Sequence, residues 1–86
     1  MYSFEIKPPL EKKLRKFRAR DITTYKRIGV KIAEVIRNPL HYKPLSYDLK
    51  GLRRAHIGHF VLSFRVNGNE KLVEFLDYEH HDKAYL

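Results

Sequence analysis

Residues 60–80 read FVLSFRVNGNEKLVEFLDYEH and predict a β-hairpin. Apolar and polar side chains alternate before and after Asn67-Gly68, and this dipeptide is the strongest short-range signal for a two-residue hairpin turn. A turn of that length pairs Leu62 with Val73, so the apolar residues of both strands share one face of the sheet. We expect that face to be buried, with core residues Phe60, Leu62, Phe64, Val73 and Phe75.

A third strand is expected over residues 52–57, because Gly58-His59 suits a tight turn that returns the chain onto the hairpin. In this register Ala55 lies on the core side of the sheet. Successive side chains of a strand point to opposite faces, so Arg54 and His56 project from the face away from the core.

The first 51 residues predict a short strand, two helices and a loop. Residues 2–6 alternate between apolar and polar side chains, which is typical of a strand with one buried face. Pro8-Pro9 suits the first turn of a helix, where the missing N–H costs nothing. Asp21 is a good N-cap for a second helix, which Pro39 ends. Residues 39–51 are then a loop rich in Pro, Tyr and Lys.

Together these elements predict an α+β fold: an N-terminal strand, a two-helix hairpin and an antiparallel meander, with the helices packed on one face of the sheet. A chain of 86 residues has room for one hydrophobic core, so we expect residues 1–86 to form a single domain.

The charge is strongly asymmetric. The formal net charge is +8, and residues 1–60 carry 15 Lys and Arg against 5 Asp and Glu, a balance of +10. Such a basic body favours a polyanion or an acidic protein as partner, and a merely soluble basic surface is the alternative. The chain has no cysteine, which excludes disulfides and thiolate metal sites. No apolar run is long enough for a bilayer and Lys7 interrupts any signal peptide, so we expect a cytoplasmic protein without membrane association.

The histidines raise the question of a metal site, since four imidazoles suffice for zinc: His56, His59, His80 and His81. The adjacent His80 and His81 cannot easily both point at one ion, and His56 and His59 straddle a turn, so the spacing is weak evidence for a metal site. We therefore predict no metal and no other cofactor. The alternative for each histidine taken alone is that it is an ordinary solvated polar residue near a loop.

The same residues suit metal-free cleavage of RNA. If the C-terminal tail folds back beside the exposed sheet face, His80 or His81 can meet His56 and Arg54. Imidazoles exchange protons near pH 7, and a guanidinium binds phosphate. Such a group can activate a 2′-hydroxyl, stabilise the phosphorane and protonate the leaving 5′-oxygen. Aromatic side chains suited to stacking on splayed bases are Tyr42, Tyr47 and Tyr85.

Over its whole length the chain resembles the RelE/ParE superfamily of toxins from type II toxin–antitoxin systems. The resemblance rests on the order of short motifs: Leu45, Gly51 and Arg53-Arg54, then an aromatic–aliphatic strand ending at Phe64, then the tail HHDKAY at residues 80–85. The family's tail commonly reads His-Arg-x-x-aliphatic-Tyr, and His81 stands here where arginine is usual. The resemblance implies the RelE-like α+β fold.

One departure places the chain nearer to the histidine-based, YafQ-like branch. Many RelE-like toxins have a phosphate-stabilising arginine after the aromatic residue of the third strand, where this chain has Val61. In the YafQ-like branch one histidine precedes the second turn and another lies four residues before a C-terminal aromatic. His56 matches the first and His81, four residues before Tyr85, matches the second. His59 lies at a supporting position.

By this resemblance the chain is an mRNA interferase, a metal-independent endoribonuclease acting on ribosome-bound mRNA and leaving 2′,3′-cyclic phosphate ends. The residues implied for catalysis are His56, His81, Arg54 and Tyr85, with the acid and base roles of the two histidines exchangeable. Those implied for RNA binding are Lys43, Lys50, Arg53 and His59. The implied partner is a cognate acidic antitoxin in a hetero-oligomer. The alternatives are a ParE-like toxin that poisons gyrase without cutting nucleic acid, and a catalytically weakened nucleic-acid-binding homologue.

Overall fold

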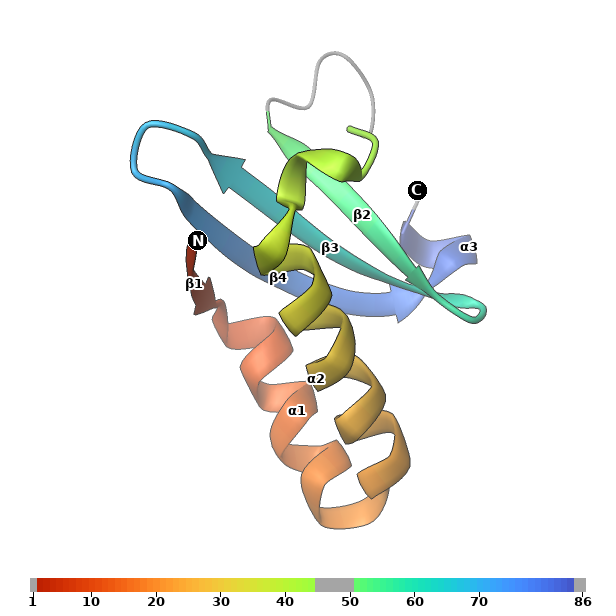
Figure 1. The fold of residues 1–86 in the computed structure, drawn as a ribbon. Coiled ribbons are helices and arrows are strands. Elements are labelled where there is room, and N and C mark those ends of the chain that lie inside the picture. The colour runs from red at the N-terminus through yellow and green to blue at the C-terminus, as the bar shows by residue number, and fades with distance from the viewer. Residues whose placement is uncertain (1, 45–50, 85–86) are drawn as a thin grey trace.

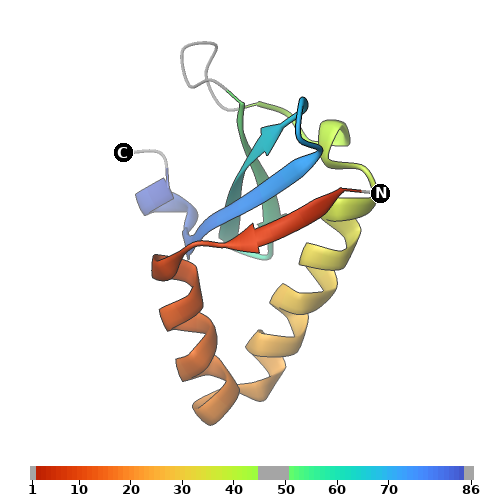
Figure 2. The same ribbon diagram turned by 90° about the vertical axis from the view of Figure 1, so that its left-hand side faces the viewer.

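The computed structural model describes residues 2–44 and 51–84 of the chain. Its elements follow in the order β1 (Ser3–Ile6), α1 (Pro8–Arg20), α2 (Ile22–Arg37), the short 3-10 helix η1 (Pro39–His41), β2 (Leu52–Ile57), β3 (Phe60–Asn67), β4 (Leu72–His80) and α3 (His81–Ala84). The strands form one sheet in the order β1-β4-β3-β2, in which β1 runs parallel to β4 and the other pairs are antiparallel (Figures 1 and 2). The predicted α+β class and element order are confirmed.

The helical hairpin forms where its local signals predict. Asp21 caps α2, since its carboxylate accepts a hydrogen bond from the Thr24 backbone N–H at 3.2 Å, and α2 ends at Arg37, two residues before Pro39. Lys13 of α1 ties the hairpin to the sheet by donating to the Tyr78 carbonyl at 2.8 Å and pairing with Asp77 at 2.9 Å. No helix within the described residues has the length and hydropathy of a segment that crosses a membrane.

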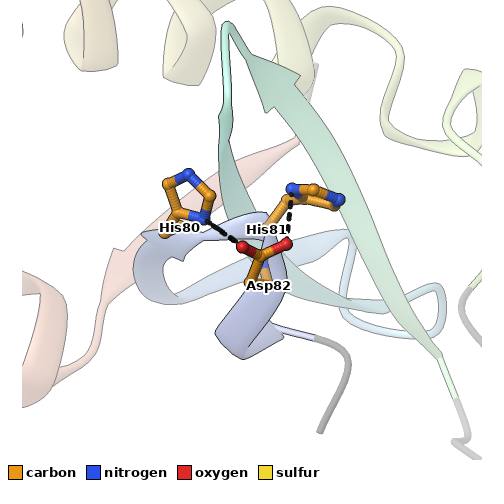
Figure 3. A group of neighbouring side chains, drawn as sticks. All are labelled: His80, His81 and Asp82. Atoms are coloured by element: carbon orange, nitrogen blue, oxygen red, sulfur yellow. Dashed lines mark hydrogen bonds and ion pairs between the residues drawn. The ribbon is translucent and has the colours of Figure 1, made fainter.

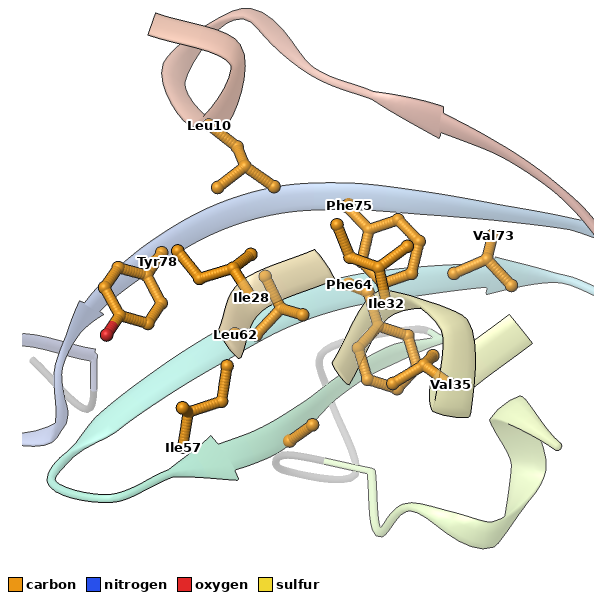
Figure 4. Packing of buried hydrophobic residues seen from close by; sticks show 11 residues of the cluster. Leu10, Ile28, Ile32, Val35, Ile57, Leu62, Phe64, Val73, Phe75 and Tyr78 are labelled. Carbon is orange, nitrogen blue, oxygen red and sulfur yellow. The ribbon is translucent and has the colours of Figure 1, made fainter. Parts of the chain in front are cut away.

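The hydrophobic core lies between the hairpin and one face of the sheet (Figure 4). Its buried members are Leu10, Ile28, Ile32, Val35, Ala55, Ile57, Leu62, Phe64, Val73, Phe75 and Tyr78. Phe64 and Phe75 are completely buried, and their ring centroids lie 5.9 Å apart on the paired strands β3 and β4. Each fully buried side chain of this size contributes about 1.5–3 kcal/mol.

The prediction of a two-residue turn between β3 and β4 is wrong. The turn spans residues 68–71 instead of Asn67-Gly68, and Leu62 lies opposite Tyr78 rather than Val73. The Asn67 side chain causes this, because its oxygen accepts from the Glu70 N–H at 3.2 Å and its amide donates to the Glu70 carboxylate at 2.7 Å. A bulge between Ser63 and Phe64 shifts the register again.

Two aromatic residues are more exposed than their strand pattern predicts. Phe60, expected in the core, keeps 37% of its surface exposed, because it begins β3 at the end of the sheet. Its ring stacks on the ring of Tyr78, with the centroids 4.8 Å apart. Phe4 is 45% exposed on the edge strand β1, where it meets Phe75 edge-on. Leu62, Phe64, Val73 and Phe75 are buried as predicted.

Candidate functional site

The face of the sheet away from the helices carries Arg54 and His56, as predicted. The β2–β3 register pairs Arg54 with Ser63 and His56 with Val61, while Ala55 between them is buried on the core side. His56 is exposed and Arg54 is partly buried. Alternation along β2 therefore presents one cation and one imidazole on the same side of an edge strand.

These two residues line a hollow of about 440 Å³ at the edge of β2. Its other lining residues are Lys31 of α2 and His41, Tyr42 and Lys43, which follow the end of α2. The lining contains three cationic side chains and two imidazoles and, within the described part of the chain, no carboxylate. Among the lining residues, Lys31 pairs with Glu34 of its own helix at 2.9 Å. Such a hollow suits a phosphate group.

Lys31 was not predicted as a site residue. It belongs to α2, which precedes β2 by many residues, and only the packing of α2 against β2 brings it to the hollow. The only sequence signal was the basic outer face of the helix, which the chain carries at many other positions.

Two residues expected to contact RNA contact the protein itself. Arg53 lies on the core side of β2, where its guanidinium donates to the Tyr42 carbonyl, and its Nε is buried without a partner among the described residues. The Tyr42 ring packs edge-on against Phe64 at 5.7 Å. Arg53 thereby holds the segment after η1 against the sheet, and its role in RNA binding stays a prediction.

The C-terminal tail folds back to the β2–β3 turn. The His81 N–H donates to the His59 carbonyl at 2.9 Å, and the His59 and His80 rings stack with centroids 6.4 Å apart. This bond fixes where β4 ends and α3 begins. The tail is a helical turn rather than an irregular segment.

His80 and His81 both lie beside the Asp82 carboxylate, whereas we expected that the adjacent pair could not easily point at one place. Figure 3 shows the Asp82 carboxylate between the two imidazole rings. His80 Nδ1 lies 3.5 Å from one Asp82 oxygen and His81 Nδ1 lies 3.3 Å from the other. The alternation rule fails because His80 is the last residue of β4 and His81 the first of α3, so the backbone turns between them.

The two predicted halves of the site lie two strands apart. His56 is opposite Val61, and Val61 is opposite Glu79, two residues before His81. Strands are spaced about 4.8 Å apart, so the backbones at His56 and Glu79 are separated by about 10 Å. Val61 between them is only 2% exposed and lies outside the helix-side core. An apolar residue therefore separates the cation-lined hollow from the tail histidines.

Tyr78 borders the tail on the helix side of the sheet. Burial raises the pKa of its hydroxyl above the usual value, so the side chain stays neutral. Its ring meets Phe17 edge-on at 5.7 Å and stacks on Phe60. These contacts anchor the end of β4 to α1. Lys50, Tyr47 and Tyr85, also named as site residues, lie outside the described residues.

Comparison with known proteins identifies relatives over nearly the whole chain. A family model described as the ParE toxin of type II toxin–antitoxin systems (parDE) matches residues 4–85. The chain is 45% identical over 86 residues to a protein of Methanocaldococcus jannaschii named putative toxin RelE4, covering 99% of this chain and 92% of the relative.

Solved toxin structures share the fold at low identity. The chain is similar to one in the intact E. coli RelBE toxin–antitoxin complex, with a TM-score of 0.75 and 15% identity over 93% of this chain and 96% of that one. It is likewise similar to one in the E. coli DinJ–YafQ complex, with a TM-score of 0.75 and 19% identity over all of both chains. At these identities the two structures establish a RelE-like fold.

Proposed function

Since the chain belongs to the ParE family of toxins from type II toxin–antitoxin systems, we propose that it is an mRNA interferase, a metal-independent endoribonuclease acting on ribosome-bound mRNA. The observation that carries this proposal is the hollow at β2, where Arg54 and His56 meet Lys31 and Lys43. A phosphodiester is the group of mRNA that such a hollow recognises.

The proposed reaction uses the RNA's own hydroxyl as nucleophile. His56 removes the 2′-hydroxyl proton, and the 2′-oxygen attacks phosphorus. His81 gives a proton to the 5′-oxygen as the P–O5′ bond breaks, which leaves a 2′,3′-cyclic phosphate. The acid and base roles of the two histidines are interchangeable at this stage. Both side chains are exposed, so an RNA strand can reach them from solvent.

The other proposed site residues bind and position the RNA. Arg54 is proposed to hold the scissile phosphate through its planar guanidinium, and Tyr85 to position the tail or stack on a base. Lys43, Lys50, Arg53 and His59 are proposed to attract the RNA backbone, which would make binding steeply salt-dependent.

The arrangement supports a place in the histidine-based, YafQ-like branch. Position 61, on the sheet face away from the helical hairpin, is a valine rather than an arginine, so it supplies no cation to a phosphate. Two histidines from different segments, His56 on β2 and His81 at the start of α3, remain for proton transfer. We therefore infer histidine-driven catalysis rather than the arginine-rich version.

An acidic antitoxin is the proposed partner in the cytoplasm, in a hetero-oligomer that silences the toxin. The balance of +10 over residues 1–60 would speed association with an acidic chain. Affinity would come from apolar anchors of an antitoxin helix. A suitable groove lies between the hairpin and β1, lined by side chains that include Phe4, Leu14, Ile32 and Ile36.

Cleavage of a labelled RNA in EDTA tests the proposal directly. We expect cleavage with cyclic phosphate ends, and His56→Ala and His81→Ala should each slow it by about 10²–10⁴-fold. Arg65→Ala is the matched control for Arg54→Ala, because Arg65 is exposed on the same sheet face but lies opposite Leu52, outside the hollow. Full activity of the His56/His81 double variant contradicts the proposed site.

The match to a ParE model favours one alternative, a toxin that poisons gyrase without cutting RNA. Adding the protein to a translation reaction and to a supercoiling reaction separates the two. Inhibition of translation alone supports the interferase. Inhibition of supercoiling alone, unaffected by His56→Ala, supports the gyrase poison. A nucleic-acid-binding homologue without catalytic activity would bind RNA and leave it uncut.

A further inference from the structure

The junction of β4 and α3 gathers three side chains that commonly bind metals. The candidate ligand atoms of His80, His81 and Asp82 all lie within 4.8 Å of one another. The carboxylate sits between the two rings, 3.5 Å from His80 Nδ1 and 3.3 Å from His81 Nδ1 (Figure 3). The three side chains are 43%, 50% and 75% exposed, so an ion in solution reaches them without unfolding the chain.

These separations are close to those of a zinc site. Bonds of about 2.0–2.2 Å in a tetrahedron place neighbouring ligand atoms about 3.3–3.6 Å apart. Each histidine nitrogen lies at this separation from a different Asp82 oxygen, and the candidate ligand atoms all lie within 4.8 Å of one another, so an ion gathers them by side-chain rotation about a backbone that already brings them together.

Local hydrogen bonds hold the junction of β4 and α3 in place. The backbone N–H of Asp82 donates to His80 Nδ1 at 3.3 Å, which orients that nitrogen toward Asp82. The backbone is also fixed, since the His81 N–H is bonded to the His59 carbonyl at 2.9 Å. The turn from strand to helix that brings the two histidines together therefore exists before any ion binds.

We propose that His80, His81 and Asp82 form a binding site for a divalent transition-metal ion of the zinc class. Two imidazole nitrogens and one carboxylate oxygen leave at least one coordination position for water or a phosphate oxygen. Imidazole ligands select zinc and its neighbours over magnesium and calcium, which take oxygen ligands.

The site has a consequence that rests on the proposed function. An ion bound to the His81 imidazole prevents that ring from becoming the imidazolium that gives a proton to the 5′-oxygen, because a metal-bound histidine is neutral. Because the proposed reaction itself needs no metal, the ion would act as an inhibitor of cleavage. Metal binding would then regulate the same active site.

Metal titration of the purified full-length chain tests the site without reference to activity. After treatment with a chelator, we expect one Co²⁺ per chain with visible absorption bands typical of tetrahedral coordination, displaced by Zn²⁺ but not by excess Mg²⁺. His80→Ala and Asp82→Ala should each weaken binding about tenfold or more. His41→Ala is the matched control, because it removes a histidine of η1 outside the cluster, and it should bind as the unaltered chain does.

Three outcomes would overturn the proposal: no binding, equal loss in the His41→Ala control, or unchanged binding in His80→Ala. Circular dichroism of each variant shows that the fold is retained. A second measurement adds Zn²⁺ to the RNA cleavage reaction, where inhibition should be reversed by EDTA and reduced about tenfold in His80→Ala. If the metal-free chain cleaves no RNA, the proposed function fails while the titration still decides the metal site.

Discussion

We predict that Gly58, in the β2–β3 turn, contributes to stability and to the position of the tail. Its backbone has φ +62°, in the left-handed region, and a Cβ added there would meet only the Arg27 guanidinium at 3.8 Å, an ordinary contact. Gly58→Ala therefore carries the cost of the left-handed backbone alone, about 1–2 kcal/mol. In a domain of this size 1 kcal/mol shifts the melting temperature by about 4–8 °C.

Two other glycines provide controls for this prediction. Gly29 lies within α2 and Gly68 lies in the β3–β4 turn, and neither has a neighbour within 4 Å of an added Cβ or a φ in the left-handed region. Gly29→Ala should stabilise the chain by about 0.5–1 kcal/mol because alanine favours helix, and Gly68→Ala should change little.

Thermal unfolding and urea denaturation measure all of these variants. Gly58→Asn should recover part of the lost stability, since asparagine tolerates the left-handed conformation. Gly58→Ala should also slow RNA cleavage, because the turn positions the His59 carbonyl that holds the His81 N–H. A melting temperature of Gly58→Ala equal to that of Gly68→Ala would refute the reasoning.

Two further predictions concern the N-cap of α2 and the hydrophobic core. Hydrogen bonds from the Thr24 hydroxyl and N–H lower the pKa of Asp21, so its cap stabilises the fold above the usual carboxyl pKa and is lost as pH falls through the lowered value. Asp21→Ala should therefore be less stable than the unaltered chain at pH 7, with the gap closing in acid, whereas Asp21→Asn should keep a pH-independent cap; a constant gap down to pH 2 contradicts this. Phe75→Ala should cost about 3–5 kcal/mol in urea denaturation, and Phe60→Ala, on a side chain that is 37% exposed, only about 1–2 kcal/mol. Equal losses would contradict the observed register.

Sequence patterns predicted the elements whose signals are local. The Asp21 cap, the Pro39 stop and the Gly58-His59 turn each depend on residues within a few positions, and all three are found as expected. The β3–β4 turn failed for a physical reason. Asn67 uses its side chain to bond Glu70, and this bond lengthens a turn that the Asn-Gly dipeptide alone would close after two residues.

The candidate site shows the same division between local and non-local information. Arg54 and His56 were placed on the exposed face because alternation along one strand determines it. The contribution of Lys31 could not be predicted, since it depends on how α2 packs against β2. The convergence of His80 and His81 was missed because it occurs where a strand becomes a helix. Neither the two-residue period of a strand nor the 3.6-residue period of a helix applies across that boundary.

Val61 explains why the site divides into two chemically different halves. On one side of it, at the β2 edge, His56 lies in a hollow lined by the cationic side chains of Lys31, Lys43 and Arg54. On the other side, His81 shares the Asp82 carboxylate with His80. The buried apolar side chain of Val61 offers no polar link between these halves. If both histidines transfer protons, they must therefore reach the same bound phosphodiester from the two sides of Val61. An ion held at the tail would then compete with one end of that phosphodiester and leave the cationic hollow unchanged, so it would reduce cleavage more than RNA binding.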